Sequence, residues 1–101
     1  MTIVICQPMK GKTFEEIKEN HDRLAKLIVA KNTDFTVLPS VFLDLPEIGN
    51  TPFHYLIKSL AQIADTDFVF FAKGWQNSRS CRVKYICCES YFIPVKYEEE
   101  L

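Results

Sequence analysis

The sequence predicts an α/β fold in which a four-stranded parallel sheet lies between helices. Short apolar runs alternate with longer segments whose apolar residues recur every three or four positions, in the order strand, helix, strand, helix, strand, helix, strand. The run from Asp67 to Ala72 is apolar almost throughout, as expected for a strand covered on both faces. Right-handed crossovers then favour the strand order 2-1-3-4. The expected architecture is a small three-layer sandwich of the flavodoxin or Rossmann-like type.

The first half of the chain supplies two strands and one helix. Ile3 to Cys6 is a β-rich run that ends at a loop containing Pro8 and Gly11. Thr13-Phe14-Glu15-Glu16 has the form of a capping box, so a helix should begin near Thr13 and end near Lys31-Asn32. Its apolar stripe comprises Phe14, Ile17, His21, Leu24 and Ile28, with His21 expected as a packed residue. A second strand should run from Phe35 to Leu38.

The second half begins with an irregular connection from Ser40 to Thr51. Loops this long in a small domain more often have a function than not. Pro52 suits the first turn of a second helix that ends at Asp65. The expected third helix spans Ser80 to Tyr91, and a short last strand spans Pro94 to Tyr97. The acidic residues from Glu98 to Leu101 suggest a solvated tail.

Composition limits the class of protein. The 101 residues are 48% hydrophobic, which is enough for one core, so we expect a single domain over residues 1–101. A net charge of −1 gives no basic field for long nucleic acid. No apolar run reaches the roughly 18 residues of a membrane span, and the first residues suggest a strand rather than a signal peptide. We expect a cytoplasmic protein without a membrane partner.

The four cysteines, Cys6, Cys81, Cys87 and Cys88, lack paired C-x-x-C spacing. They are interpreted as small buried hydrophobic residues rather than as a zinc site or a disulfide framework. Cys87 and Cys88 are neighbours that should point to different sides of a helix, so they do not suggest a redox pair. No cluster of metal-ligating residues is evident, and we expect neither a metal nor a cofactor.

Two loops follow predicted strands and should face one pocket at the carboxyl edge of the sheet. Ser78, Arg79 and Ser80 stand at a helix N-terminus with Lys84 one turn along, which favours an anion site, although Arg79 and Lys84 are alternatively solvated helix residues. Trp75 is expected either to stack on a base or to cover the end of the sheet. The expected ligand-binding residues are Gln7, Pro8, Met9, Lys10, Gly11, Trp75, Ser78, Arg79, Ser80 and Lys84.

The same loops carry a family resemblance. Ile-Cys-Gln-Pro-Met-Lys-Gly occupies Ile5 to Gly11, and Asp67 with its strand precedes Gly74-Trp75 and Ser78-Arg79. Together they resemble the nucleoside 2-deoxyribosyltransferase-like superfamily, in its small phage and bacterial members, over essentially the whole chain. The resemblance implies that Ser78 contacts a 5′-phosphate or its equivalent. It also implies a homodimer or higher homo-oligomer and, if the protein is phage-encoded, a location in the host cytoplasm.

One departure from that family concerns catalysis. In its enzymes a glutamate on the third helix attacks C1′ of a nucleoside and an aspartate on the second helix assists at the base. The resemblance places these positions on Lys84 and Ser59. An ammonium opposes an oxocarbenium-like transition state, and Glu89 lies about 140° around the helix from Lys84. We therefore expect no catalytic residue in this chain.

Three functions remain open at this point. The first is non-catalytic binding, and by extension sequestration in phage counter-defence, of a nucleotide or nucleotide-derived signal. The second is a nucleoside 2-deoxyribosyltransferase or nucleotide N-glycosidase that uses another carboxylate, with Glu89, Asp65 and Glu98 as candidates. The third is a protein-interaction scaffold. Aromatic residues that could cover an interface between subunits include Phe53, Tyr55, Tyr85, Tyr91 and Phe92.

Overall fold

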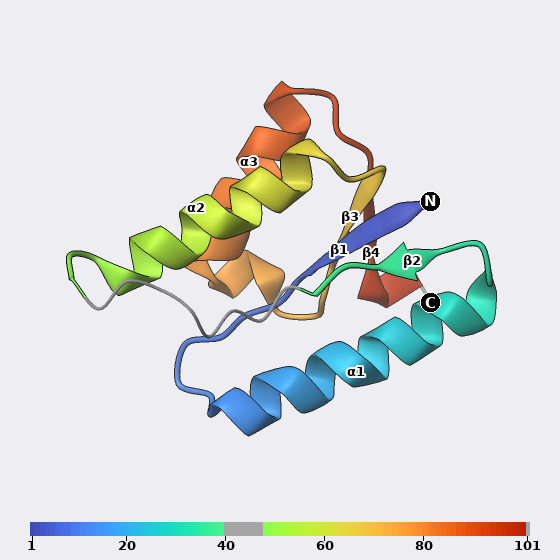
Figure 1. The fold of residues 1–101 in the computed structure, drawn as a ribbon, viewed down its shortest axis with the longest axis horizontal. Coiled ribbons are helices and arrows are strands. Elements are labelled where there is room, and N and C mark those ends of the chain that lie inside the picture. The colour runs from blue at the N-terminus through green and yellow to red at the C-terminus, as the bar shows by residue number, and fades with distance from the viewer. Residues whose placement is uncertain (40–47, 101) are drawn as a thin grey trace.

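A four-stranded, all-parallel sheet organises the chain, as the sequence predicted. The computed structural model describes residues 1–39 and 48–100 and shows this sheet between helices (Figure 1). The strands are β1 (Thr2–Cys6), β2 (Thr36–Val37), β3 (Phe68–Phe71) and β4 (Val95–Tyr97). Their order is β2-β1-β3-β4, and every neighbouring pair is parallel. Both the fold class and the predicted order 2-1-3-4 are confirmed.

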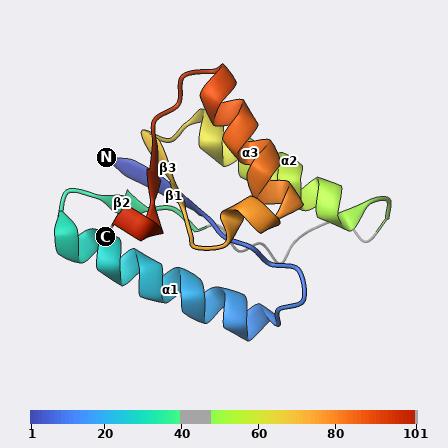
Figure 2. The ribbon, with the colours of Figure 1, turned by 180° about the vertical axis from the view of Figure 1, so that it is seen from behind.

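The helices cover both faces of the sheet. In Figures 1 and 2, α1 (Phe14–Lys31) lies on one side, and α2 (Thr51–Ala64) and α3 (Arg79–Ser90) lie together on the other. Two short 3₁₀ turns complete the described structure, η1 (Trp75–Asn77) before α3 and η2 (Glu98–Glu100) after β4. The chain continues from β1 to β2 at one edge of the sheet and from β3 to β4 at the other edge. The strand order therefore reverses between β1 and β3. That reversal is where ligands of such sheets bind.

Side-chain caps fix where the helices begin. Thr13 Oγ1 accepts a hydrogen bond from the Glu16 amide at 3.1 Å, and Glu16 Oε1 accepts one from the Thr13 amide at 3.0 Å. This is the predicted capping box, and it satisfies two amides that the first turn leaves without partners. The Asn50 side chain caps α2 by accepting from the Phe53 amide at 3.1 Å, with Pro52 in the first turn as expected.

The core consists of two layers, one on each face of the sheet. Alternate residues of β1 point to opposite sides, so Ile3 and Ile5 pack toward α1 while Val4 and Cys6 pack toward α2 and α3. The α1 layer adds Leu24, Ile28, Phe68, Phe70 and Ala72. The α2 and α3 layer adds Ile63, Val69, Phe71, Cys81 and Cys88. All four residues of β3 are buried, which confirms the prediction of a central strand covered on both faces.

Some sequence expectations differ from the structure. The second strand is only two residues long, and Phe14 from the predicted apolar stripe is 40% exposed rather than packed. Of the predicted connection from residue 40 to 51, residues 40–47 lie outside the described part of the chain. The prediction of a wholly solvated acidic tail is wrong for Glu98, whose side chain is about one-tenth exposed. In the described residues, no helix is both long and apolar enough to cross a membrane.

Candidate functional site

The two loops singled out by the sequence lie side by side at the carboxyl edge of the central strands. The Ala72 amide at the end of β3 donates to the Cys6 carbonyl at 2.9 Å. Gly74, with a φ of 85°, turns the second loop, and a Cβ there would lie 3.7 Å from Cγ of Pro8 in the first loop. The left-handed backbone favours glycine at this turn. The loops therefore meet where strand order reverses.

The second loop delivers a serine cap to α3. Ser78 is the N-cap residue, and its Oγ accepts a hydrogen bond from the Cys81 amide at 3.4 Å. The Ser78 and Ser80 hydroxyl oxygens lie 3.3 Å apart, and Arg79 between them is exposed. A helix N-terminus carries unpaired amides and a partial positive charge, so hydroxyls and a guanidinium here form an environment suited to an anion. The Arg82 guanidinium binds within the same loop, where it donates a hydrogen bond to the Gln76 carbonyl at 3.0 Å.

Gln7 belongs to the protein interior rather than to the exposed loop. The residue is only 1% exposed, and its Nε2 donates to the Ile17 carbonyl at 3.1 Å. Its Oε1 accepts from Nδ2 of Asn20 at 2.9 Å, so both ends of the amide are paired within the protein. These bonds tie the end of β1 to α1. Gln7 was expected to touch a ligand, and the structure gives it an internal partner at each end instead.

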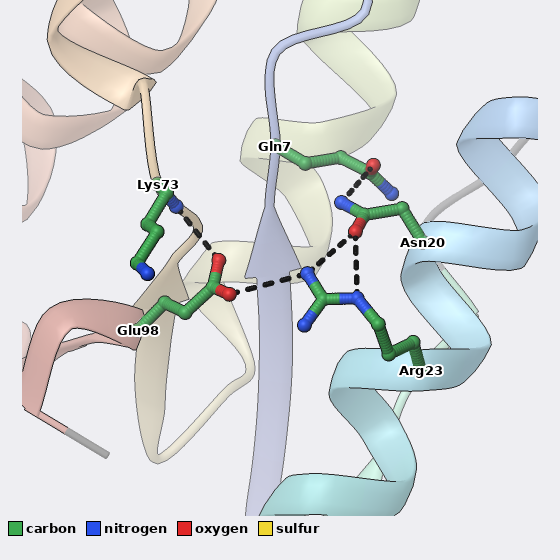
Figure 3. A network of polar contacts seen from close by, with 5 residues as sticks. All are labelled: Gln7, Asn20, Arg23, Lys73 and Glu98. Carbon is green, nitrogen blue, oxygen red and sulfur yellow. Dashed lines mark hydrogen bonds and ion pairs between the residues drawn. The ribbon is translucent and has the colours of Figure 1, made fainter.

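A chain of polar contacts extends from Gln7 across the carboxyl edge (Figure 3). Asn20 Oδ1 accepts from Nε and NH2 of Arg23 at 3.2 and 2.7 Å. Arg23 in turn reaches Glu98 Oε2 at 3.1 Å, and Glu98 Oε1 accepts from the Lys73 amide at 2.9 Å. The network therefore joins α1 to the residues that follow β1, β3 and β4.

Glu98 is the acidic member of this network. Burial raises the pKa of the Glu98 carboxyl, but the Lys73 amide and the Arg23 guanidinium outweigh that effect and hold the pKa below its ordinary value of 4.5. The carboxylate is thus ionised at neutral pH, and both of its oxygens have protein partners. No local pattern in the sequence indicates this pairing, because Arg23 and Glu98 are 75 residues apart.

Trp75 packs against other aromatic rings. Its ring centroid lies 4.8 Å from that of Tyr85, 5.1 Å from that of Phe71 and 5.8 Å from that of Tyr97. Desolvation raises the pKa of the Tyr97 hydroxyl to about 12, and a hydrogen bond with Tyr85 adds to the shift. This cluster favours the alternative in which Trp75 covers the end of the sheet over the one in which it stacks on a base.

Lys84 is buried, which the sequence did not anticipate. The side chain is 3% exposed, and its ammonium lies 5.8 Å from the centre of the Tyr55 ring. Among the described residues, only Gln7, Ser59 and Lys84 are buried polar or charged residues. All three belong to the larger set of positions that the family resemblance singled out. Burying a polar or charged group is costly unless the group has a partner.

The remaining residues of the first loop are more accessible. Pro8 and Met9 are half-buried, whereas Lys10 and Gly11 are exposed. The Lys12 amide donates to the Met9 carbonyl at 3.2 Å and closes a turn in which Gly11 has a φ of 79°. The exposed part of the candidate site therefore consists of this turn and the Ser78–Ser80 segment.

The other candidate acids lie at the far edge of the sheet. Asp65 caps the C-terminus of α2, and Glu89 lies in the last turn of α3. Because these helices run antiparallel to the strands, their C-terminal ends lie at the amino edge. Glu89 is ten residues beyond Arg79, or about 15 Å along the helix axis. Of the three acids considered for glycosidic chemistry, only Glu98 lies at the carboxyl edge.

Surface hollows and metal-binding groups add no further site here. Hollows of about 680 and 340 Å³ lie along α1, and neither is lined by residues 7–11 or 74–84. The expectation that the two loops face a single pocket therefore gains no support from these hollows. Within the described residues, no group of three His, Cys, Asp or Glu side chains is placed to hold a metal ion.

No protein-family model, no curated protein and no solved structure matches this chain. The resemblance to the nucleoside 2-deoxyribosyltransferase-like superfamily therefore stays a prediction from the two loops.

Proposed function

We propose that this chain binds a nucleotide or nucleotide-derived molecule without catalysing its turnover. The observation that carries the proposal is the start of α3, where two serine hydroxyls 3.3 Å apart flank an exposed arginine. A phosphate or pyrophosphate group is the ligand chemistry that such a helix start, with its unpaired amides, recognises best.

Charge supports an anionic ligand over a neutral nucleoside. Arg79 is exposed, so its guanidinium can form a bidentate contact with phosphate oxygens. Lys84 lies one turn along the same helix and adds positive charge from beneath the surface, because it is buried. Lys10 adds an exposed ammonium on the neighbouring loop. The base and sugar would then lie over Pro8 and Met9, the half-buried part of that loop.

The absence of turnover follows from the position of the charges. The position that the family resemblance assigns to the nucleophile holds Lys84, whose ammonium cannot attack or stabilise a cationic sugar carbon. Glu98, the one candidate carboxylate at this edge, is bound by Arg23 and by the Lys73 amide. A carboxylate paired in this way would have to release Arg23 before it reached a sugar.

The test is a titration of purified protein with inorganic phosphate, AMP and ADP-ribose by calorimetry. The double variant Arg79→Ala, Ser80→Ala removes the guanidinium and one hydroxyl but keeps the Ser78 cap. Charge-assisted hydrogen bonds contribute about 1.5–3 kcal/mol, so affinity should fall at least about tenfold. The matched control is Lys26→Ala, which removes an exposed charge from the second half of α1, away from both loops, and should leave affinity unchanged.

The outcomes separate the alternatives. Unchanged affinity in the double variant would refute the proposed site. Release of free base from deoxynucleoside monophosphates, lost in Glu98→Gln, would instead establish N-glycosidic chemistry. Failure to bind any of the three ligands would leave the scaffold function as the better account.

The scaffold and oligomer predictions share one structural observation. Large apolar side chains are exposed on the outer sides of α2 and α3 and on the turn that follows α3. They are Phe53, Ile57, Ile86, Tyr91 and Phe92. Exposed apolar surface of this kind is typical of protein contacts. The homo-oligomer remains a prediction that light scattering would test directly.

A further inference from the structure

Two cysteine sulfurs meet beneath the candidate site. The Sγ atoms of Cys6 and Cys81 lie 3.0 Å apart, although both cysteines are free thiols. Cys6 is 1% exposed and Cys81 is 0% exposed. Two sulfurs packed without bonding are normally farther apart than this, and a disulfide needs about 2.05 Å, so the sulfurs must approach by roughly 1 Å for a bond to form.

The fold itself creates this pair. Cys6 is the last residue of β1, and Cys81 lies in the first turn of α3, which follows the neighbouring strand β3. The two side chains meet on the sheet face that α2 and α3 cover. The residues are 75 positions apart, so no local spacing brings them together.

The surroundings make the two sulfurs chemically different. A hydrogen bond from Cys6 lowers the pKa of the Cys81 thiol, and despite the opposing effect of burial the Ser78 and Ser80 hydroxyls and the Lys84 ammonium help to bring it to about 7. Burial raises the pKa of Cys6 well above its ordinary value, and the bond to Cys81 adds to this. Cys81 is thus the thiol of the pair that loses its proton more readily near neutral pH, and Cys6 is the one that keeps it. Reactive cysteines occur in such electropositive surroundings.

We propose that Cys6 and Cys81 form a redox site, in which hydrogen peroxide oxidises the two thiols to a disulfide that links the carboxyl end of β1 to the first turn of α3. This site does not depend on nucleotide binding. Peroxide is close to water in size, and the first turn of a helix opens more readily than its interior. A small oxidant can therefore reach Cys81 without global unfolding.

The reaction proceeds in two balanced steps. The Cys81 thiolate attacks one peroxide oxygen, so that an S–O bond forms, the O–O bond breaks, and the departing hydroxide takes up the proton that Cys81 had lost. The product is a sulfenic acid and one water. The Cys6 sulfur then attacks the Cys81 sulfur, the S–S bond forms, the S–O bond breaks, and the hydroxide leaves as a second water with the Cys6 proton. Two thiols lose two electrons, and one peroxide becomes two waters.

The other two cysteines provide an internal comparison. Cys88 is buried, and desolvation raises its pKa to about 11, so it stays a thiol at neutral pH. Cys87 is half-buried and has no sulfur hydrogen bond among the described contacts. Selective oxidation at Cys6 and Cys81 would therefore reflect this one pair and not the cysteine content of the chain.

Peptide mapping of the native protein tests the proposal. Trypsin cleaves after Lys10, Arg79, Arg82 and Lys84, which places Cys6, Cys81 and the Cys87-Cys88 neighbours in three different peptides. Folded protein is treated with hydrogen peroxide, alkylated, digested without reductant and analysed by mass spectrometry. We expect a cross-link between the peptides 1–10 and 80–82 that dithiothreitol reverses, together with an upward shift of the thermal midpoint.

Variants and controls make the result decisive. Cys87→Ser should give the same cross-link, whereas Lys84→Met should form it more slowly at neutral pH because the thiolate loses its neighbouring cation. In urea, the same peroxide treatment should distribute cross-links among all four cysteines. The proposal is overturned if folded wild-type protein yields no cross-link between peptides 1–10 and 80–82, if Cys81 proceeds to sulfinic acid, or if the folded and urea-treated samples pair alike.

Discussion

Phe92 is an unusual residue at the end of α3, and its replacement by glycine should stabilise the protein. It follows the C-cap residue Tyr91 and has a φ of 58°, the left-handed region that bulky residues avoid. The Ile93 amide donates to the Cys88 carbonyl at 2.9 Å, which is the hydrogen bond of a Schellman turn. Glycine is the usual residue at the Phe92 position of that turn. The aromatic ring is 92% exposed, so its removal sacrifices almost no packing.

The expected gain combines two opposing terms. A left-handed backbone costs a residue with a side chain about 1–2 kcal/mol, and Phe92→Gly relieves that cost. Glycine gains extra freedom in the unfolded chain, which costs about 0.5–1 kcal/mol. The net increase in the free energy of unfolding is therefore about 0.5–1 kcal/mol. For a chain of this size, that corresponds to a rise in thermal midpoint of about 2–8 °C.

Urea unfolding followed by circular dichroism measures this change. Phe92→Ala is the matched control, because it removes the ring but keeps a side chain in the left-handed region, and it should stay within about 0.5 kcal/mol of wild type. A loss of stability in both variants would refute the reasoning and show that the ring is packed in solution. If that loss grew with protein concentration, the packing would lie between subunits.

Two further predictions concern the network at the carboxyl edge and the aromatic cluster. Glu98→Gln should lower the free energy of unfolding at neutral pH by about 1 kcal/mol, after allowance for partial exposure. Because folding lowers the Glu98 pKa, this contribution is present above the ordinary value of 4.5 and is lost as the pH falls through the folded value, so unfolding curves of the two proteins should converge in acid. If the two unfolding curves did not converge in acid, the charge of the Glu98 carboxylate would not be what stabilises the fold. Phe71→Ala, at a fully buried ring beside Trp75, Tyr85 and Tyr97, should cost about 3–5 kcal/mol in urea unfolding, and a loss under 1 kcal/mol would mean that the cluster repacks around the cavity.

The fold was accessible from sequence because its signals are local. The capping box from Thr13 to Glu16, the proline at position 52 and the apolar run of β3 each specify one element without reference to distant residues. With right-handed crossovers, the expected order 2-1-3-4 places helices on both faces of the sheet, as the structure shows (Figure 1). The predicted ends of the elements were less accurate. The second strand is only Thr36–Val37, because the length of a strand depends on how many residues of the neighbouring strand pair with it.

The candidate site was accessible only in part, because its contacts are distant in sequence. Ser78 and Ser80 could be placed from the helix start that they precede. Gln7 could not, since its partners are the Ile17 carbonyl and the Asn20 amide on the first helix. The acidic run after β4 suggested that Glu98 belongs to a solvated tail. Its contact with Arg23 depends on the folded chain.

The proximity of Cys6 and Cys81 follows from the topology of the sheet and not from cysteine spacing in the sequence. Spacing rules compare neighbouring positions, and they gave no significance to Cys87 and Cys88. Topology compares positions along adjacent strands. Cys6 ends the first strand and Cys81 opens the helix after its neighbour β3, so the predicted order 2-1-3-4 already placed both at one edge. The direction in which each side chain points was the missing information.

The buried ammonium of Lys84 bears on both the proposed lack of turnover and the proposed chemistry of Cys81. No carboxylate among the described residues forms an ion pair with Lys84, whose ammonium lies 5.8 Å from the centre of the Tyr55 ring. A thiolate at Cys81 is an anion that this ammonium stabilises, since Lys84 lowers the Cys81 pKa. A carboxylate in the place of Lys84 would repel that thiolate and raise the same pKa. The residue on which the proposed lack of glycosidic turnover rests is therefore also the one that favours the proposed reactive sulfur in the first turn of α3.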